Sequence, residues 1–346
     1  MSASETAAAG RRLLPAWGVV GTLAVATLAL AGFAALVGAY PVSIGEAARI
    51  LAGWIAGSPD GSTAETVMLE VRLPRIIAAL MVGASLAGSG AVYQGLFRNP
   101  LVSPDILGVS TGAGLGAVLG IFLSLPIVAI QGFAFAGGLA TVATVYAIAA
   151  AVRGREPVLV LVLAGVVVGA LAGSVISLLK VLADPYDQLP AITFWLLGSL
   201  ASIRSADVWA VLPAILIGLV PLVALRWRIN VLALGDDEAK TLGVETGKLR
   251  VLVIGAATLM TASVVAISGV IGWVGLVMPH IARMLVGPNF GRLLPAAMLL
   301  GAFYLLGVDT LARTMAQTET PLGILTAFVG APFFLWLLAR GRHGWE

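Results

Sequence analysis

The sequence predicts an all-α membrane protein whose single domain, residues 1–346, crosses the bilayer ten times. Hydrophobic residues make up 60% of the chain and charged residues only 11%, whereas an ordinary soluble domain carries about 25% charged residues. A chain that folded in water would need a polar surface that this composition cannot supply. Lipid is therefore expected to surround it, and ten apolar stretches are long enough to cross a bilayer.

The expected spans are joined by short turns and by three longer segments. In chain order they cover residues 14–39, 74–96, 106–125, 127–151, 158–182, 207–226, 248–268, 270–286, 293–312 and 321–339. The first apolar run, 13–40, is about twice as long as the apolar core of a signal peptide, so we expect it to remain as a span. Prolines stand near several starts, where a missing backbone N–H costs little.

Small residues are concentrated inside several spans. The chain contains 42 glycines, and the stretches 83–90 and 112–116 consist mainly of Gly, Ala and Ser. Such stretches let helices approach closely in lipid. Segment 112–116 also looks like part of a Gly-rich dinucleotide loop, but no strand is predicted before it and the final Gly is missing. We therefore interpret both stretches as helix-packing surfaces.

Charge predicts the orientation. Ten spans place both termini on one side of the membrane, and 14 of the 20 Lys and Arg residues fall on that side. The positive-inside rule makes it the cytoplasm. The six basic residues left on the outside are Arg49, Arg72, Arg75, Lys180, Arg204 and Arg313. Of the longer segments, 41–73 and 184–206 then lie outside, and each is expected to contain a short helix at the membrane surface.

The third longer segment, 230–247, is a cytoplasmic insert. Asp236, Asp237 and Glu238 crowd the start of a short predicted helix, where the helix dipole favours anions, and Gly243 ends it. Ala239 and Leu242 fall on one face, three residues apart. We interpret the insert as a point where a soluble partner transmits force. A solvated loop with incidental caps is the alternative, and the spacing alone does not decide between them.

The sequence argues against chemistry carried out by the chain itself. It has no Cys, which excludes disulfides and thiolate ligands, and its two His residues, His280 and His343, belong to no acidic cluster. No P-loop motif for ATP is present. The net charge of +3 comes from basic residues at span ends and not from a nucleic-acid surface. No ionisable residue lies in the middle of an expected span, which disfavours a proton-coupled transporter. We expect neither an enzyme nor a bound cofactor or metal.

Two further groups of residues invite functional interpretations. Arg72, Arg75 and Arg313 lie on the disfavoured outer side, where they could dock an acidic partner; anchoring of helix ends, with Asp309 paired to Arg313, is the alternative. The cytoplasmic loop 98–105 is kept from helical geometry by two prolines, and its Leu101 could plug a pore, although a tight connector explains it equally well.

Several blocks of sequence together resemble one known family. They are RLPR at 72–75, GASLAGSGAVYQGLFRNPL at 83–101, LGVSTGAG at 107–114, ALG at 233–235, GVIGWVGLVMPHIAR at 269–283 and GAPF at 330–333. In this order they resemble the FecCD-type permeases of ABC importers. That family moves ferric siderophores, heme, cobalamin and oxyanions such as molybdate across bacterial and archaeal cytoplasmic membranes.

The resemblance implies a type II importer: a homodimer of ten-span subunits with the pathway between them, two copies of a cytoplasmic ATPase that use ATP and Mg, and one substrate-binding protein outside. By position, Arg72, Arg75 and Arg313 match docking arginines, and Asn99 and Leu101 match a cytoplasmic gate. The insert matches the coupling helix through Gly235, Asp236, Asp237, Glu238, Ala239, Leu242 and Gly243.

A second family gate aligns with Val158 and Leu159. These residues are apolar here, whereas the cobalamin branch has small polar residues, so this chain departs from that pattern. An iron chelate is the expected cargo, with heme, cobalamin or molybdate as alternatives. An ion-coupled secondary transporter and an intramembrane enzyme are the rival classes, and a heterodimer of related permeases is the alternative to the homodimer.

Overall fold

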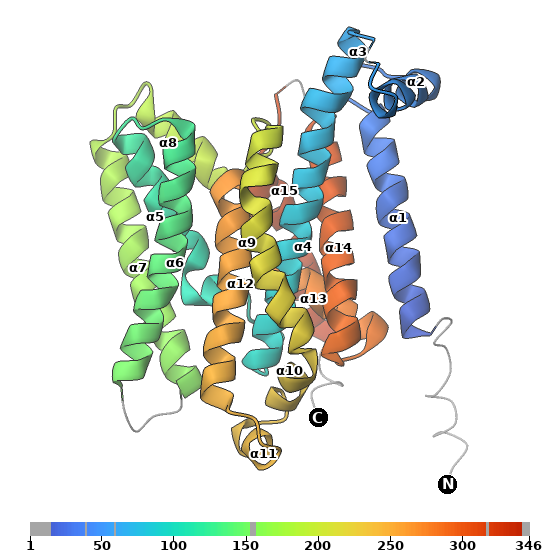
Figure 1. Ribbon diagram of the computed structural model, residues 1–346. Helices are drawn as coiled ribbons and strands as arrows, with labels where there is room; N and C mark the ends of the chain where they lie inside the picture. The colour runs from blue at the N-terminus through green and yellow to red at the C-terminus, as the bar shows by residue number, and fades with distance from the viewer. Residues whose placement is uncertain (1–14, 39, 59, 153–156, 316–317, 341–346) are drawn as a thin grey trace.

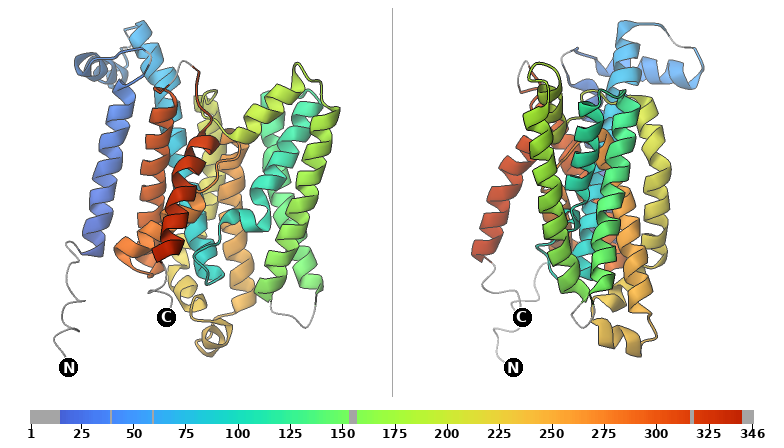
Figure 2. Two further views of the ribbon diagram at one scale, coloured as in Figure 1. Left: turned by 180° about the vertical axis from the view of Figure 1, so that it is seen from behind. Right: turned by 90° about the vertical axis from the view of Figure 1, so that its left-hand side faces the viewer.

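The computed structural model describes residues 15–38, 40–58, 60–152, 157–315 and 318–340, and these residues form helices and turns without any strand. Arg11, Arg12, Arg153, Arg155, Arg342 and His343, which entered the analysis of charge and metal binding, lie outside the described residues. The long helices run roughly side by side (Figures 1 and 2).

The helices are as follows, in chain order. They are α1 (Ala16–Leu36), α2 (Ile44–Ile55), α3 (Thr63–Thr66), a π-helical turn (Val67–Arg72), α4 (Leu73–Leu96), a 3₁₀ turn (Pro104–Leu107), α5 (Val109–Phe122), α6 (Ile127–Ala151), α7 (Pro157–Leu182), α8 (Gln188–Leu197), α9 (Ser205–Ala224), α10 (Arg226–Leu232), α11 (Asp236–Thr241), α12 (Thr246–Ser268), α13 (Val274–Val286), α14 (Phe290–Ala312) and α15 (Leu322–Arg340).

All ten expected spans contain a helix. Within the described residues, seven helices are long and apolar enough to cross a membrane, namely those containing α1, α4, α6, α7, α9, α12 and α14. The helices α5, α13 and α15 are apolar but shorter. The expected span 106–125 is helical in α form only from Val109, after a 3₁₀ turn, and residues 270–273 precede α13 without being helical. The all-α, multi-span prediction is confirmed, and the differences concern where the shorter helices begin.

The most deeply buried of the long helices are α4, α12 and α14. The most apolar window of α4 is 78% buried, that of α12 is 72% buried and that of α14 is 61% buried, against 11% for α1. Figure 1 shows α1 on one flank, α5, α6 and α7 on the other, and α4, α12 and α14 between them. The outer helices therefore offer their apolar side chains to lipid, while the central helices are shielded by protein.

Glycines set the distances between the core helices. A Cβ atom added to Gly83 of α4 would overlap the carbonyl of Gly301 of α14, and one added to Gly90 would overlap the backbone of Gly275 of α13. Gly116 of α5 faces the backbone of α6 in the same way. The backbones touch at these points, which side chains would prevent. The helix-packing interpretation of both Gly-rich stretches is confirmed.

The outer segment 41–73 contains the expected surface helix. α2 begins with a capping box, in which the Ser43 backbone N–H donates to the Glu46 carboxylate at 2.9 Å. This hydrogen bond lowers the pKa of Glu46 below its usual range. A small apolar cluster that includes Val42, Ile50 and Met68 joins α2 to the helix that follows. The other outer segment contains α8, as expected.

The second span starts earlier than the sequence suggested. Helical structure is continuous for 34 residues, from Thr63 to Leu96, because a π-helical turn connects α3 to α4. The N–H of Leu73 donates to the carbonyl of Met68, five residues back. This wider turn lets the chain pass Pro74, which has no N–H, without ending the helix.

Candidate functional site

The cytoplasmic insert folds as a short acidic helix. α11 starts after Gly235, whose φ is 137°, and stops before Gly243, whose φ is 77°. Both positive φ values favour glycine, so the two glycines fix the length of the helix. Asp236, Asp237 and Glu238 occupy its first turn, as predicted. In Figure 1, α11 projects below α12 at the end of the molecule where α1 begins.

An ion pair fastens the insert to the body of the protein. Nη2 of Arg250 on α12 donates to Asp236 Oδ1 at 2.7 Å, and the arginine side chain is only 6% exposed. Nε of Arg250 is buried without a hydrogen-bond partner in the part of the chain that the structure describes. The Asp236 carboxylate therefore provides the charge that compensates a buried guanidinium.

Ala239 and Leu242, which the sequence placed on one face of the insert, differ in their exposure to solvent. Leu242 is 54% exposed, but Ala239 is completely buried. The backbone N–H of Val244 folds back to the Ala239 carbonyl at 3.0 Å, so the helix turns this residue toward the protein. The prediction that Ala239 and Leu242 share one exposed face is wrong for Ala239. The exposed residues of this helix and its C-terminal cap are Asp237, Glu238, Lys240, Thr241 and Leu242.

The expected gate loop lies next to this insert. Oδ1 of Asn99 accepts a hydrogen bond from the Leu101 N–H at 2.9 Å, and the Leu101 side chain is 41% exposed. Arg98 has a positive φ of 48°, and its Nη1 lies 3.4 Å from the position that a Cβ on Gly235 would occupy. The structure thus brings loop 98–101 and the start of α11 together, which spacing in the sequence did not reveal.

The second expected gate pair lies at the start of α7. Leu159 is 46% exposed, while Val158 packs partly buried against the core. The 3₁₀ turn that follows the gate loop packs on the same helix, where the carbonyl of Ile106 leaves no room for a Cβ on Gly165. Val158 and Leu159 therefore lie on the same helix, α7, against which the 3₁₀ turn after the gate loop packs.

The outer arginines are enclosed by protein. Arg75 donates to Asp309 with three hydrogen bonds of 2.9 to 3.1 Å and to Glu319 with two of 2.7 and 3.0 Å. Arg72 donates to the carbonyls of Ala35 at 2.7 Å, of Leu36 at 3.1 Å and of Tyr40.

Arg313 completes this cluster. It donates to the carbonyl of Ala34 and lies 4.0 Å from Asp309. Because α1 ends at Leu36, its last backbone carbonyls have no N–H donors within the helix. Arg72 and Arg313 donate hydrogen bonds to these carbonyls, and their positive charge is favourable at the C-terminus of a helix. These contacts favour the anchoring interpretation, and docking stays a prediction. The sequence did not identify Glu319 as a partner of Arg75, because Glu319 lies in a loop seven residues after the end of α14, where helical spacing does not predict contacts.

An apolar groove of about 640 Å³ lies on another face. It is bounded by α8, by residues 270–273 and by α15, and its lining includes Leu197, Val270, Trp273 and Phe328. Trp273 adopts a positive φ of 72°, and its ring packs over Gly330, where a side chain would collide with it. The groove carries no charged residue, so a solute would pass along it without strong polar contacts.

Metal-binding chemistry is not evident in the described residues, which contain no group of three or more His, Cys, Asp and Glu side chains. His280 on α13 has a buried Nδ1 without a hydrogen-bond partner in the described residues. Arg283, one turn later on α13, also has two buried nitrogens without partners in the described part of the chain.

Comparison with known proteins gives a consistent result. The model of the FecCD transport family matches residues 23–340. The molybdate import system permease protein MolB of Haemophilus influenzae is 41% identical over 308 residues, which are 89% of this chain and 91% of that protein. An iron chelatin transport system permease protein of Helicobacter pylori is 44% identical over 281 residues, 81% of this chain and 85% of that protein.

A solved structure also matches over nearly the whole chain. It is described as an inward-facing conformation of a metal-chelate type ABC transporter. The TM-score is 0.84 at 38% identity, and the match covers 93% of this chain and 99% of that chain.

Proposed function

The chain belongs to the FecCD transport family, and we propose that it is the permease of an ABC importer that carries an iron chelate, such as a ferric siderophore, into the cytoplasm. The observation that carries this proposal is the family match over residues 23–340, which includes the gate loop and the insert. The chain itself has no ATP-binding motif. ATP hydrolysis, with Mg, is therefore assigned to separate ATPase subunits, and this chain is not an enzyme.

The proposed complex contains two copies of this chain, two ATPase subunits and one substrate-binding protein outside the membrane. The apolar groove beside α15 is open on the single subunit, and a second copy facing it would enclose a pathway. The acidic insert around α11 is the proposed contact with the ATPase. Asn99 and Leu101, followed by Val158 and Leu159, are the proposed cytoplasmic gates.

The cargo is inferred from the names of the relatives and of the matching structure. The Haemophilus relative is named for molybdate and the Helicobacter relative for iron chelatin, at 41% and 44% identity. Identity over the whole chain therefore does not select the cargo. The metal-chelate type of the matching structure favours an iron chelate. Heme, cobalamin and molybdate are the alternatives for the same machinery, and an ion-coupled transporter is the alternative outside this class.

Uptake measurements test the proposal. A strain that lacks this chain should lose uptake of radiolabelled ferric siderophore and regain it when the chain is supplied with its ATPase. Labelled heme, cobalamin and molybdate measured in parallel identify the cargo. Uptake that continues with an inactive ATPase, and that stops when an uncoupler is added while ATP is maintained, would instead establish an ion-coupled transporter.

A further inference from the structure

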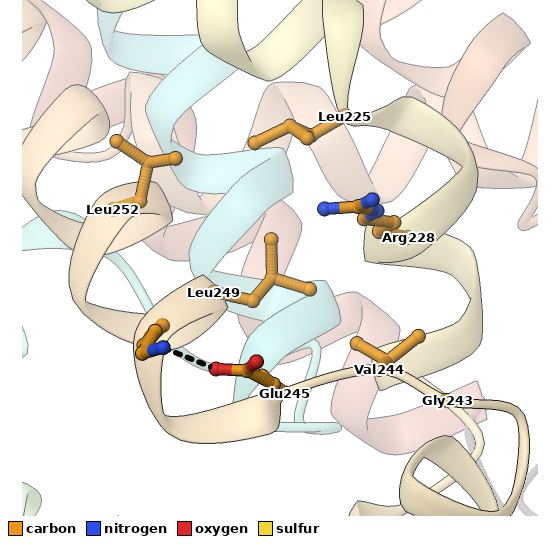
Figure 3. A pocket seen from close by; sticks show the side chains of 8 residues that line it. Leu225, Arg228, Gly243, Val244, Glu245, Leu249 and Leu252 are labelled. Carbon is orange, nitrogen blue, oxygen red and sulfur yellow. Dashed lines mark ion pairs between the residues drawn. The ribbon is translucent and has the colours of Figure 1, made fainter.

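A cavity of about 310 Å³ lies at the cytoplasmic end of the bundle, between α10 and α12. Figure 3 shows its walls: Leu225 and Leu252 at one end, Leu249 behind, and Val244 and Glu245 at the other end. The residues between α11 and α12 form its edge, so the cavity adjoins the base of the insert. None of the proposed gate residues and none of the three outer arginines line this cavity.

Two basic side chains line the cavity, Arg228 from α10 and Lys248 from α12. The guanidinium of Arg228 points from α10 into the space, and it makes no ion pair within the described residues (Figure 3). Lys248 pairs with Glu245 at 2.7 Å, but these side chains are 85% and 71% exposed. Such an exposed pair contributes little stability, so Lys248 can leave Glu245 for another anion at little cost. A phosphate in the cavity would meet an unpaired arginine on the α10 wall and an available lysine on the α12 wall.

Apolar residues also line the cavity, and exposed apolar residues follow on the same elements. Leu252 of α12 is 49% exposed, and Val220 and Val223 near the end of α9 are 64% and 46% exposed. Trp227, beside Arg228, is 60% exposed, and tryptophan is typical of the level of the lipid headgroups. The cavity thus combines two basic side chains with the apolar side chains of Leu225, Leu249 and Leu252, close in the sequence to exposed apolar residues of α9 and α10.

We propose that this cavity binds an anionic phospholipid of the cytoplasmic leaflet. Arg228 receives the phosphate as a bidentate donor, Lys248 supplies a second positive charge, and acyl chains lie over Leu225 and Leu252. A peptide segment of the ATPase fits less well, because it would have to bring apolar side chains past the Lys248–Glu245 pair to the depth of Leu252. A bound lipid braces residues 243–245, and with them the base of the coupling insert.

The test uses the assembled permease–ATPase complex, purified and exchanged into vesicle-derived nanodiscs. Phosphatidylglycerol is the probe, with phosphatidylcholine as the neutral lipid. Native mass spectrometry should find phosphatidylglycerol retained by the native complex, and Arg228→Gln should weaken that retention about tenfold, with Lys248→Gln weakening it less. Arg292→Gln, which removes an exposed arginine at the same membrane face on α14, is the matched control and should retain lipid normally.

Three results would overturn the proposal. Arg228→Gln and Lys248→Gln could both retain phosphatidylglycerol as well as the control does. Inorganic phosphate without lipid could protect the complex against heat as well as phosphatidylglycerol does, which would make the site one for a free anion. Arg228→Gln could lose the ATPase while keeping its lipid, which would assign the cavity to the partner protein. None of these outcomes affects the importer proposal, which is tested by uptake.

Discussion

Arg250 and Asp236 form an ion pair at 2.7 Å in which the arginine is buried and the aspartate is 34% exposed. The pair joins the core helix α12 to the exposed helix α11. Because the buried partner belongs to the core, the insert cannot move away from α12 without uncovering a charge that has no other ionic partner in the described structure. The pair therefore makes the insert move with α12, as a force-transmitting element requires.

Replacing Asp236 with Asn should uncouple the importer. The buried guanidinium loses its compensating charge, which costs about 1–3 kcal/mol, so the insert detaches from α12 more easily. We expect ATP hydrolysis by the complex to continue while uptake per ATP falls, measured together in proteoliposomes. Asp237→Asn is the matched control, because Asp237 is 95% exposed and pairs only with Lys240 at 3.4 Å. Equal coupling in the two variants would exclude this role for the ion pair.

Removing Arg75 should destabilise the permease strongly. Asp309 is completely buried and would keep only the distant Arg313 as a basic neighbour. Breaking a buried pair by removing one partner typically costs about 3–5 kcal/mol. We expect Arg75→Met to lower the thermal unfolding temperature in detergent well below that of Glu319→Gln, whose side chain is 41% exposed. Similar unfolding temperatures would show that the cluster does not anchor the helices.

Glu319→Gln also separates docking from anchoring. Glu319 occupies one side of Arg75, so removal of its charge leaves that guanidinium more available to an acidic group of a binding protein. If Arg72, Arg75 and Arg313 dock such a protein, the variant should bind it several-fold more tightly, with the difference greatest at low salt. Affinity that is unchanged across a salt series would leave anchoring as the role of the cluster.

Shortening Leu101 should open the cytoplasmic side. Its side chain is exposed on the single subunit and is held by the turn around Asn99, so Leu101→Ala removes apolar volume without disturbing the core. We expect vesicles reconstituted with this variant to leak a labelled cargo analogue without ATP, and vesicles with Leu159→Ala to leak less.

Single cysteines at positions 99 and 101 should crosslink between subunits in one nucleotide state only. Any crosslink can be assigned to the introduced cysteine, because the native chain has no Cys. Tight vesicles and no crosslinks would place the gate elsewhere.

Two glycines of the same helix should respond differently to one methyl group. A Cβ on Gly90 would overlap the backbone of Gly275, whereas one on Gly95 meets nothing within 4 Å. Gly90→Ala should therefore destabilise the protein by about 1–3 kcal/mol through overpacking. Gly95→Ala should be neutral or slightly stabilising, since Ala favours a helix. Unfolding in detergent distinguishes the two, and equal effects would contradict the backbone contact between α4 and α13.

Composition and apolar length predicted the positions of the helices more accurately than the contacts between residues of different helices. Apolar length located α1, α6, α7 and α14 within a few residues, because the cost of exposing a backbone to lipid fixes such helices locally. The start of α4 was predicted to within one residue, but the helical extension before it, from Thr63, was not, because Pro74 normally marks a helix start and the π-helical turn before it depends on the outer segment. The burial of Ala239 and the partners of Arg75 depend on residues far away in the sequence, so spacing within one segment could not reveal them.

The continuous helix from Thr63 to Leu96 has 34 residues, or about 51 Å at 1.5 Å per residue, compared with a hydrocarbon layer of about 30 Å. One stiff rod therefore begins outside the membrane, beside the cluster formed with α2, and ends at the gate loop in the cytoplasm. A tilt imposed on its outer end displaces its inner end directly, with no relay of side chains in between. The close backbone contact between Gly83 and Gly301 lies between the two ends of this helix, so any tilt of the helix would turn about a point inside the membrane and move its two ends in opposite directions.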